Sequence, residues 1–321
     1  MKKFLVFSAL SLSLLSVGPA FAIALAANGT FVQPSSSGAF DSGDCSTPQQ
    51  PCRTITYALS QTPATGQVNI VGPADFYESL TITQGVTLYA VDSDVRLVPP
   101  SGQAGITINA AITDNVNLRG FQIVGTAGGA NGIVANSVSK LALTNMSIAG
   151  FNSGVGINFS PNTAGSNFPV LYMQDSIVRY NNGNILISPT NSVGASADLK
   201  RSTSQFAATY GVRADGSSTA GQVQVTISDS EITNVTNNGI LAVSNGSMSR
   251  IMVDHTIVAH MGTNGVTASG TGAQVLMNNS TITFSNNAIL AQSGGTVQSY
   301  GNNAVNFDAG NTTFSGSQML K

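Results

Sequence analysis

Asn238-Gly239-Ile240, Asn264-Gly265-Val266 and Asn287-Ala288-Ile289 are the last three copies of a short phrase that recurs along this 321-residue chain. The four earlier copies are Asn131-Gly132-Ile133, Ser153-Gly154-Val155, Asn182-Gly183-Asn184 and Tyr210-Gly211-Val212. Successive copies lie 22, 29, 28, 28, 26 and 23 residues apart, which averages 26. A fixed period in this range is typical of a solenoid, in which each repeat forms one coil.

The segments between the copies alternate apolar and polar residues. Val223, Val225 and Ile227 follow this pattern, as do Ile251 and Val253. A period of two residues predicts strands, and nothing in these segments shows the 3.6-residue period of a helix. With two or three short strands in each repeat, residues 67–310 are predicted to form an all-β parallel β-helix of about nine coils, in which equivalent strands of successive coils pair.

Turn chemistry accounts for the residues of the recurring phrase. Glycine tolerates a positive φ angle, and asparagine is the next best choice. Asparagines that stack in adjacent coils can also form ladders of side-chain amide hydrogen bonds. The phrase is therefore interpreted as a structural corner and not as a ligand motif.

The two ends of the chain differ from the repeats. Residues 1–22 resemble a signal peptide, with Lys2 and Lys3, an apolar stretch over 4–17 and Ala20-Phe21-Ala22 at the cleavage point. The protein is therefore expected to be exported to the periplasm, the cell surface or the medium. Residues 23–52 form an irregular lead-in, 53–66 a short helix that caps the first coil, and 311–321 a C-terminal tail.

The only two cysteines, Cys45 and Cys52, lie in the lead-in. In an exported protein such a pair predicts a local disulfide rather than a metal or redox site.

Composition excludes several partners. Charged residues make up 8% of the chain and the net charge is −2, so neither nucleic acid nor an anionic membrane is expected as a partner. Hydrophobic residues make up 42%, which is enough to form a core. After the signal segment, no stretch is apolar for long enough to cross a bilayer.

Two further phrases carry a resemblance to a known group. Pro51-Cys52-Arg53-Thr54 with Ala58-Leu59 near the start, and Ser299-Tyr300-Gly301-Asn302-Asn303 near the end, resemble exported bacterial members of the pectin-lyase-like superfamily. The resemblance covers about residues 41–310 and implies a right-handed parallel β-helix. The superfamily includes pectate lyases, polygalacturonases, phage tailspikes and adhesin domains, so the fold does not select a function.

One column of polar residues is the sharpest candidate for chemistry. Asn145, Asp175, Arg201, Asp229, Asp254 and Asn279 each follow an alternating strand at a similar place in successive repeats. This alignment predicts that Asp229 and Asp254 lie about 5 Å apart on one face. Two close carboxylates suit glycoside hydrolysis or a Ca²⁺ ion as cofactor, and Arg201 suits a substrate anion.

A structural interpretation of the same column competes with the catalytic one. Because the column also contains asparagine, we favour its interpretation as a ladder of polar corner residues over a catalytic site. The Asn-Thr-Asp, Asp-Asp, Gly-His-Gly and Arg-x-Lys motifs of polygalacturonase-like enzymes are absent from the chain. The alignment near Glu231 is also ambiguous by one residue.

Aromatic residues give the second candidate. Sugar-binding faces are commonly lined with aromatic rings, and Tyr180 and Tyr210 fall at similar points of adjacent repeats. The favoured hypothesis is an exported, non-catalytic protein that binds polysaccharides or cell-surface glycans, or mediates adhesion. A polysaccharide lyase or glycoside hydrolase, and a purely structural surface protein, are the alternatives.

Overall fold

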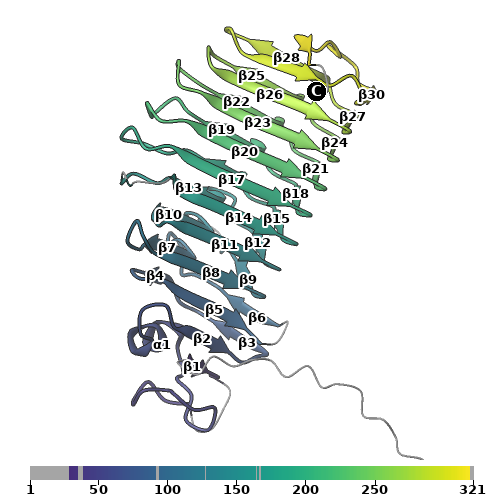
Figure 1. Cartoon of the computed structure of the whole chain (residues 1–321). Helices are drawn as coiled ribbons and strands as arrows, with labels where there is room; N and C mark the ends of the chain where they lie inside the picture. The colour runs from purple at the N-terminus through teal and green to yellow at the C-terminus, as the bar shows by residue number, and fades with distance from the viewer. Residues whose placement is uncertain are drawn as a thin grey trace, which may run out of the picture.

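The computed structural model describes residues 29–34, 39–91, 94–126, 128–163, 165 and 168–318. Over these residues the chain winds into a rod of stacked coils, with the helix and β1 at one end and β28 and β30 at the other (Figure 1). The predicted signal peptide of residues 1–22 lies outside the described residues.

Three parallel sheets, here called A, B and C, run along the rod, and their strands are given in order across each sheet. Sheet A contains β1 (Gly29–Val32), β2 (Gln67–Ile70), β5 (Val86–Ala90), β8 (Asn115–Arg119), β11 (Lys140–Thr144), β14 (Val170–Gln174), β17 (Ala195–Lys200), β20 (Val223–Ser228), β23 (Ser249–Asp254), β26 (Ala273–Asn278), β29 (Thr296–Ser299) and β31 (Gly316–Ser317). Sheet B contains β3 (Ala74–Phe76), β6 (Val95–Leu97), β9 (Gln122–Val124), β12 (Ser147–Ala149), β15 (Ile177–Arg179), β18 (Thr203–Gln205), β21 (Glu231–Thr233), β24 (Ile257–Ala259), β27 (Thr281–Thr283) and β30 (Ala304–Asn306). Sheet C contains β4 (Leu80–Ile82), β7 (Ile106–Asn109), β10 (Ile133–Ser137), β13 (Val155–Phe159), β16 (Gly183–Ile187), β19 (Tyr210–Asp215), β22 (Asn238–Val243), β25 (Asn264–Ser269) and β28 (Asn287–Gln292).

Each strand pairs with the equivalent strand of the next coil, so the side chains of one position form a column along the rod. Val225, Ile251 and Val275 are one such column, and all three are buried. Alternation places these residues inside and their polar neighbours outside. The predicted all-β parallel β-helix is confirmed, with about eight turns where about nine were expected.

The anchor glycines are required for a different reason from the one predicted. None of the anchor glycines has a positive φ angle. A Cβ atom on Gly239 would instead lie 2.7 Å from the carbonyl oxygen of Gly265 in the next coil. The glycines therefore allow the close approach of two backbones.

Strand pairing also corrects the alignment of two copies of the phrase. Ile133 pairs with Ile157, which makes Gly156 and not Gly154 the counterpart of Gly132. In the next coil Ile157 pairs with Ile185, so Asn184 occupies this position in place of Gly183.

The predicted amide ladder is present at the last three copies. Asn264 Nδ2 donates to Asn238 Oδ1 at 2.9 Å, and Asn287 Nδ2 donates to Asn264 Oδ1 at 3.1 Å. Each side-chain amide thus donates a hydrogen bond to the asparagine of the preceding coil.

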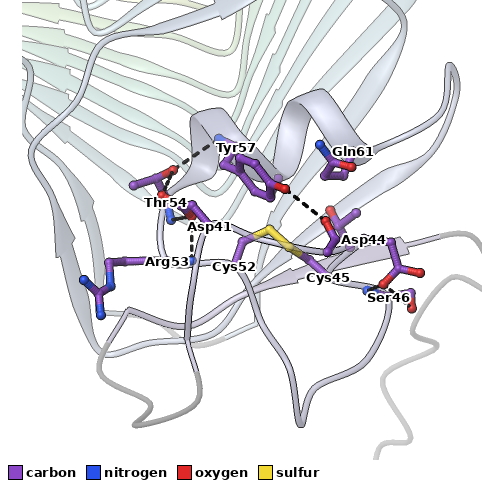
Figure 2. Close-up of a disulfide and its surroundings, with 12 residues drawn as sticks. Asp41, Asp44, Cys45, Ser46, Cys52, Arg53, Thr54, Tyr57 and Gln61 are labelled. Atoms are coloured by element: carbon purple, nitrogen blue, oxygen red, sulfur yellow. Dashed lines mark hydrogen bonds between the residues drawn. A yellow bond between two sulfur atoms is a disulfide. The ribbon is translucent and has the colours of Figure 1, made fainter.

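The N-terminal end is closed by a helix and a disulfide-bonded loop. Helix α1 (Ile55–Gln61) falls inside the segment predicted to be helical, and Thr54 caps it by accepting a hydrogen bond from the amide of Tyr57. Ile55 and Ala58 are buried against the first coil. Cys45 and Cys52 form the predicted disulfide, and Figure 2 shows it beneath the helix.

Both terminal segments add a strand to sheet A. β1 lies in the segment predicted to be an irregular lead-in and pairs with β2. β31 lies in the predicted tail and pairs with β29, while Phe314 packs against the core. Among the described residues, no helix is long and apolar enough to span a membrane.

Candidate functional site

The corner between sheets A and B consists of two residues in most coils. The first of them has φ between 44° and 53°, the left-handed region, and its side chain projects into solvent. The residues at this position are Asn145, Asp175, Arg201, Asp229, His255 and Asn279. The predicted column is therefore correct except in one coil, where His255 replaces Asp254.

The error has a simple physical origin. Ser228 pairs with Asp254, so Asp254 is the last residue of β23 and Asp229 aligns with His255. Asp254 and His255 are adjacent polar residues, and the alternation of the preceding strand fits either as the corner. The two carboxylates of Asp229 and Asp254 consequently belong to different columns.

Arg201 is held by the carboxylate of the preceding coil. Its Nε and Nη2 atoms donate to the two carboxylate oxygens of Asp175 at 2.8 and 3.0 Å. The hydrogen bonds from Arg201, followed by one from Gln174, lower the pKa of Asp175. Asp229 lies on the other side of Arg201 and adds to the raised pKa of the guanidinium. The result is an acid–base–acid series along the corner.

The carboxylate of Asp254 is hydrogen-bonded to neighbouring side chains. It accepts hydrogen bonds from Asn278 Nδ2 at 2.7 Å, and its Oδ1 atom lies 3.0 Å from Nδ1 of His255. Desolvation alone would raise the pKa of Asp254, but the hydrogen bonds from His255 and Asn278 together lower it.

A shallow depression opens beside this corner. Arg201, Asp229 and His255 line one side, and Glu231 and Ile257 of sheet B line the other. Two carboxylates, a guanidinium and an imidazole could bind a charged sugar or exchange a proton with it. No group of three or more His, Cys, Asp or Glu side chains suited to a metal ion occurs in the described part of the chain.

The second residue of the corner builds a ladder of buried hydroxyl groups. The backbone amide of Ser202 donates to Ser230 Oγ at 3.1 Å, and the amide of Ser230 donates to Thr256 Oγ1 at 3.4 Å. Each hydroxyl donates in turn to the carbonyl two residues before it. This ladder satisfies buried backbone groups and so holds the exposed left-handed residues in place.

Tyr180 and Tyr210, predicted to fall at similar points of adjacent repeats, occupy different positions in the coil. Tyr180 occupies the corner between sheets B and C, where its ring stacks on Phe206 with centroids 4.8 Å apart. Tyr210 lies in β19 and pairs with Gly183, where its ring occupies the space a side chain would need. The tyrosine pair is therefore replaced by a ladder of Tyr180 and Phe206, and farther along by His260, Phe284 and Phe307.

The aromatic ladder presents ring edges rather than ring faces. Neighbouring rings are parallel to within 8°, and each covers the face of the next. Sugars stack on ring faces, so the interior of this ladder is better suited to structural packing than to binding. Asn234 interrupts the ladder between Phe206 and His260.

A recess on the outer surface of sheet A combines apolar and polar groups. Its floor contains Met252 and Leu276, which are paired neighbours on β23 and β26 near the C-terminal end of the rod (Figure 1). Arg250 Nε donates to Gln274 Oε1 at 2.9 Å along one rim. Gln318, next to β31, donates to Gln298 Oε1 at 3.1 Å along the other. We call the site formed by Arg250, Met252, Gln274, Leu276, Gln298 and Gln318 the sheet A recess.

The fold resembles that of a solved structure. The pectate lyase Pel9A superposes with a TM-score of 0.56 at 12% sequence identity, over 88% of this chain and 80% of the lyase. The protein has a pectin-lyase-like fold. The Dettilon tailspike protein gives a TM-score of 0.43 at 12% identity, over 87% of this chain and 61% of the tailspike. No family model and no curated protein matches this sequence.

Within this pectin-lyase-like fold, the sheet A recess is the site that sequence reasoning missed. Met252 and Leu276 are 24 residues apart and become neighbours only through strand pairing. Gln318 belongs to the segment predicted to be a tail. One signal in the sequence could have revealed them. At the solvent-facing position of sheet A that Thr226 occupies, the next two coils carry the apolar residues Met252 and Leu276.

Proposed function

We propose that this protein is an exported, non-catalytic β-helix that binds glycans of the cell surface or surrounding matrix through the sheet A recess. The observation that supports this most directly is an apolar floor of Met252 and Leu276 beside the guanidinium of Arg250 and three glutamine amides. Pyranose rings present apolar C–H patches beside hydroxyl groups, and a site of this composition complements both.

Charge favours an acidic glycan in this recess. Arg250 is the one ionisable residue that lines it, and its Nε atom is oriented by Gln274. A guanidinium fixed in this way can donate to a carboxylate with its terminal nitrogens. The glutamine amides can donate to and accept from sugar hydroxyls.

A glycan array tests this proposal. The mature protein is expected to bind oligosaccharides that contain uronic acid, and Arg250→Gln to lose about tenfold or more in affinity, because a hydrogen bond to a charged group is broken. Lys140→Gln removes another cation of sheet A outside the recess and serves as the matched control. Absence of binding to every glycan, or equal losses in both variants, would contradict the proposal and favour a structural surface protein.

A polysaccharide lyase or glycoside hydrolase is the second candidate. It is favoured by the depression lined by Arg201, Asp229, Glu231 and His255 on a fold shared with a pectate lyase. In this case Asp229→Asn would abolish the release of short oligosaccharides from an acidic polysaccharide without lowering the melting temperature. If wild-type protein releases no product from a panel of such polysaccharides, this candidate fails.

A further inference from the structure

A second cluster of polar side chains lies at the opposite end of the rod from the sheet A recess, on sheet B. Asp75 pairs with Arg96, and Arg96 pairs with Gln122, so β3, β6 and β9 place these three side chains in one row. The row therefore presents a carboxylate, a guanidinium and an amide at successive coil spacings of about 4.8 Å.

The first two members of the row orient each other. Arg96 donates from Nε to Asp75 Oδ1 and from Nη2 to Asp75 Oδ2, each at 2.7 Å. These hydrogen bonds, the largest influence on the group, lower the pKa of the Asp75 carboxyl. The side chain of Arg96 is 50% exposed and that of Asp75 is 31% exposed. The bidentate contact fixes the planes of both groups.

A depression surrounds the row. Besides Asp75, Arg96 and Gln122, it is lined by Pro73, Ala74 and Asp94. Tyr77 stands beside it with 74% of its surface exposed, and its hydroxyl oxygen lies 3.5 Å from Oδ2 of Asp75. An exposed ring next to oriented acceptors and donors is the composition of a site for a single sugar ring.

We infer that this depression is a separate binding site for one neutral pyranose unit. Two carboxylates face it against one guanidinium, which is already neutralised by Asp75. A uronic acid would be repelled there, whereas sugar hydroxyls can donate to Asp75 and Asp94 and accept from Arg96 and Gln122. The sheet A recess, with Arg250 and no lining carboxylate, has the opposite preference.

This inference extends the proposed function, on which it rests, because it gives the rod two sugar sites of different selectivity. The depression is lined by residues of β3, β6 and β9 in sheet B, and the recess by residues of β23, β26 and β29 in sheet A. Figure 1 shows β3 and β6 near the N-terminal end of the rod and β23 and β26 toward the other end. A rod with sites at opposite ends can connect a neutral glycan chain to an acidic one.

Side-chain NMR of the full mature protein can test the two sites separately. The Nε–H groups of Arg96, Arg201 and Arg250 are each hydrogen-bonded to a neighbouring side chain, so each offers a resonance in a defined environment. Methyl glycosides of glucose, galactose and mannose are the neutral probes, and methyl galacturonide is the acidic probe. Arg96 is expected to shift saturably with at least one neutral probe and not with the galacturonide.

The Arg201 resonance is the matched reference for the neutral probes, because its pairing with Asp175 reproduces that of Arg96 with Asp75, whereas the depression beside Arg201 suits a charged sugar. Tyr77→Ala is expected to weaken the Arg96 response at least fivefold while Arg96 keeps its hydrogen bonds to Asp75. If Arg96 does not respond, responds as Arg201 does, or prefers the galacturonide, the inference is wrong. A response of Arg250 alone would leave the proposed function intact and overturn only this second site.

Discussion

Single residues decide how closely the coils of this rod approach. Gly239 has no side chain to separate it from the carbonyl of Gly265, and Gly211 relates to Gly239 in the same way. Where the column reaches β28, Ala288 replaces glycine and is fully buried. Glycine therefore occurs in this column where the backbones of two coils lie in close contact.

Gly239→Ala is expected to destabilise the protein by about 1–3 kcal/mol, because the new methyl group overpacks the space between two coils. Its Cβ atom would lie 2.7 Å from the Gly265 oxygen and 3.0 Å from Sδ of Met261. Urea unfolding measures the change. Gly246→Ala is the comparison, since that glycine has open space but a φ of 117°, so its cost is conformational and not steric. An unchanged midpoint for Gly239→Ala would show that the coils are not in this register.

The ion pair of Asp175 and Arg201 makes the stability of the folded protein depend on pH. The pKa of Asp175 is lowered in the folded state, so its stabilising contribution is present above the pKa of the unfolded chain and is lost as pH falls through the folded value. In Arg201→Gln the pKa of Asp175 should rise toward its ordinary value of 3.8, as followed by carboxyl NMR. Asp75, paired with Arg96, should keep its lowered pKa in the same variant. A fixed pKa for Asp175 would mean that the two groups are not paired in solution.

The sequence predicted the strands of this rod more completely than it predicted the candidate sites. Alternation in Val225 and Ile227 predicted both the strand and its buried face, because a period of two follows directly from strand geometry. The position of Asp254 was wrong by one residue, since two adjacent polar residues satisfy the same alternation. The sheet A recess could not be predicted because Met252, Leu276 and Gln318 meet only once the coils are stacked.

Asn234 offers a test of the aromatic ladder. It interrupts the column between Phe206 and His260, at a left-handed position that phenylalanine occupies in other coils. Asn234→Phe is expected to stabilise the protein by about 1 kcal/mol, because stacking on both Phe206 and His260 contributes about 0.5–1.5 kcal/mol per pair. This gain exceeds the cost of replacing asparagine, which is better suited to a positive φ. Thermal unfolding with Asn234→Leu as the non-aromatic control measures the gain. A loss in Asn234→Phe equal to that in the control would show that the rings do not stack as a ladder.

The N-terminal cap covers one end of a rod in which each coil contacts mainly its neighbours. The disulfide joins Cys45 to Cys52 across seven positions of the chain, and both residues belong to the core (Figure 2). Removal of the pair in Cys45→Ser with Cys52→Ser is expected to cost about 2–3 kcal/mol from the entropy of loop closure.

Hydrogen exchange can show which coils lose stability when the disulfide is removed. Amides of β1 and β2 should exchange faster in the double serine variant, while amides of β22 and β25 should exchange at an unchanged rate, because repeats interact mainly with adjacent repeats. A uniform increase along the rod would instead indicate one cooperative unit.

A glycan bound in the sheet A recess would cover Met252, so oxidation of methionine tests the proposed binding site without any substitution. Met252 is half-buried on the floor of the recess, and Met248 is half-buried in the preceding loop. Mild peroxide converts accessible methionine to the sulfoxide, which mass spectrometry quantifies at each site. With a saturating glycan identified on the array, the oxidation rate of Met252 should fall at least threefold while that of Met248 stays constant. Equal rates at Met252 with and without the bound glycan would contradict the claim and place the binding surface elsewhere on the rod.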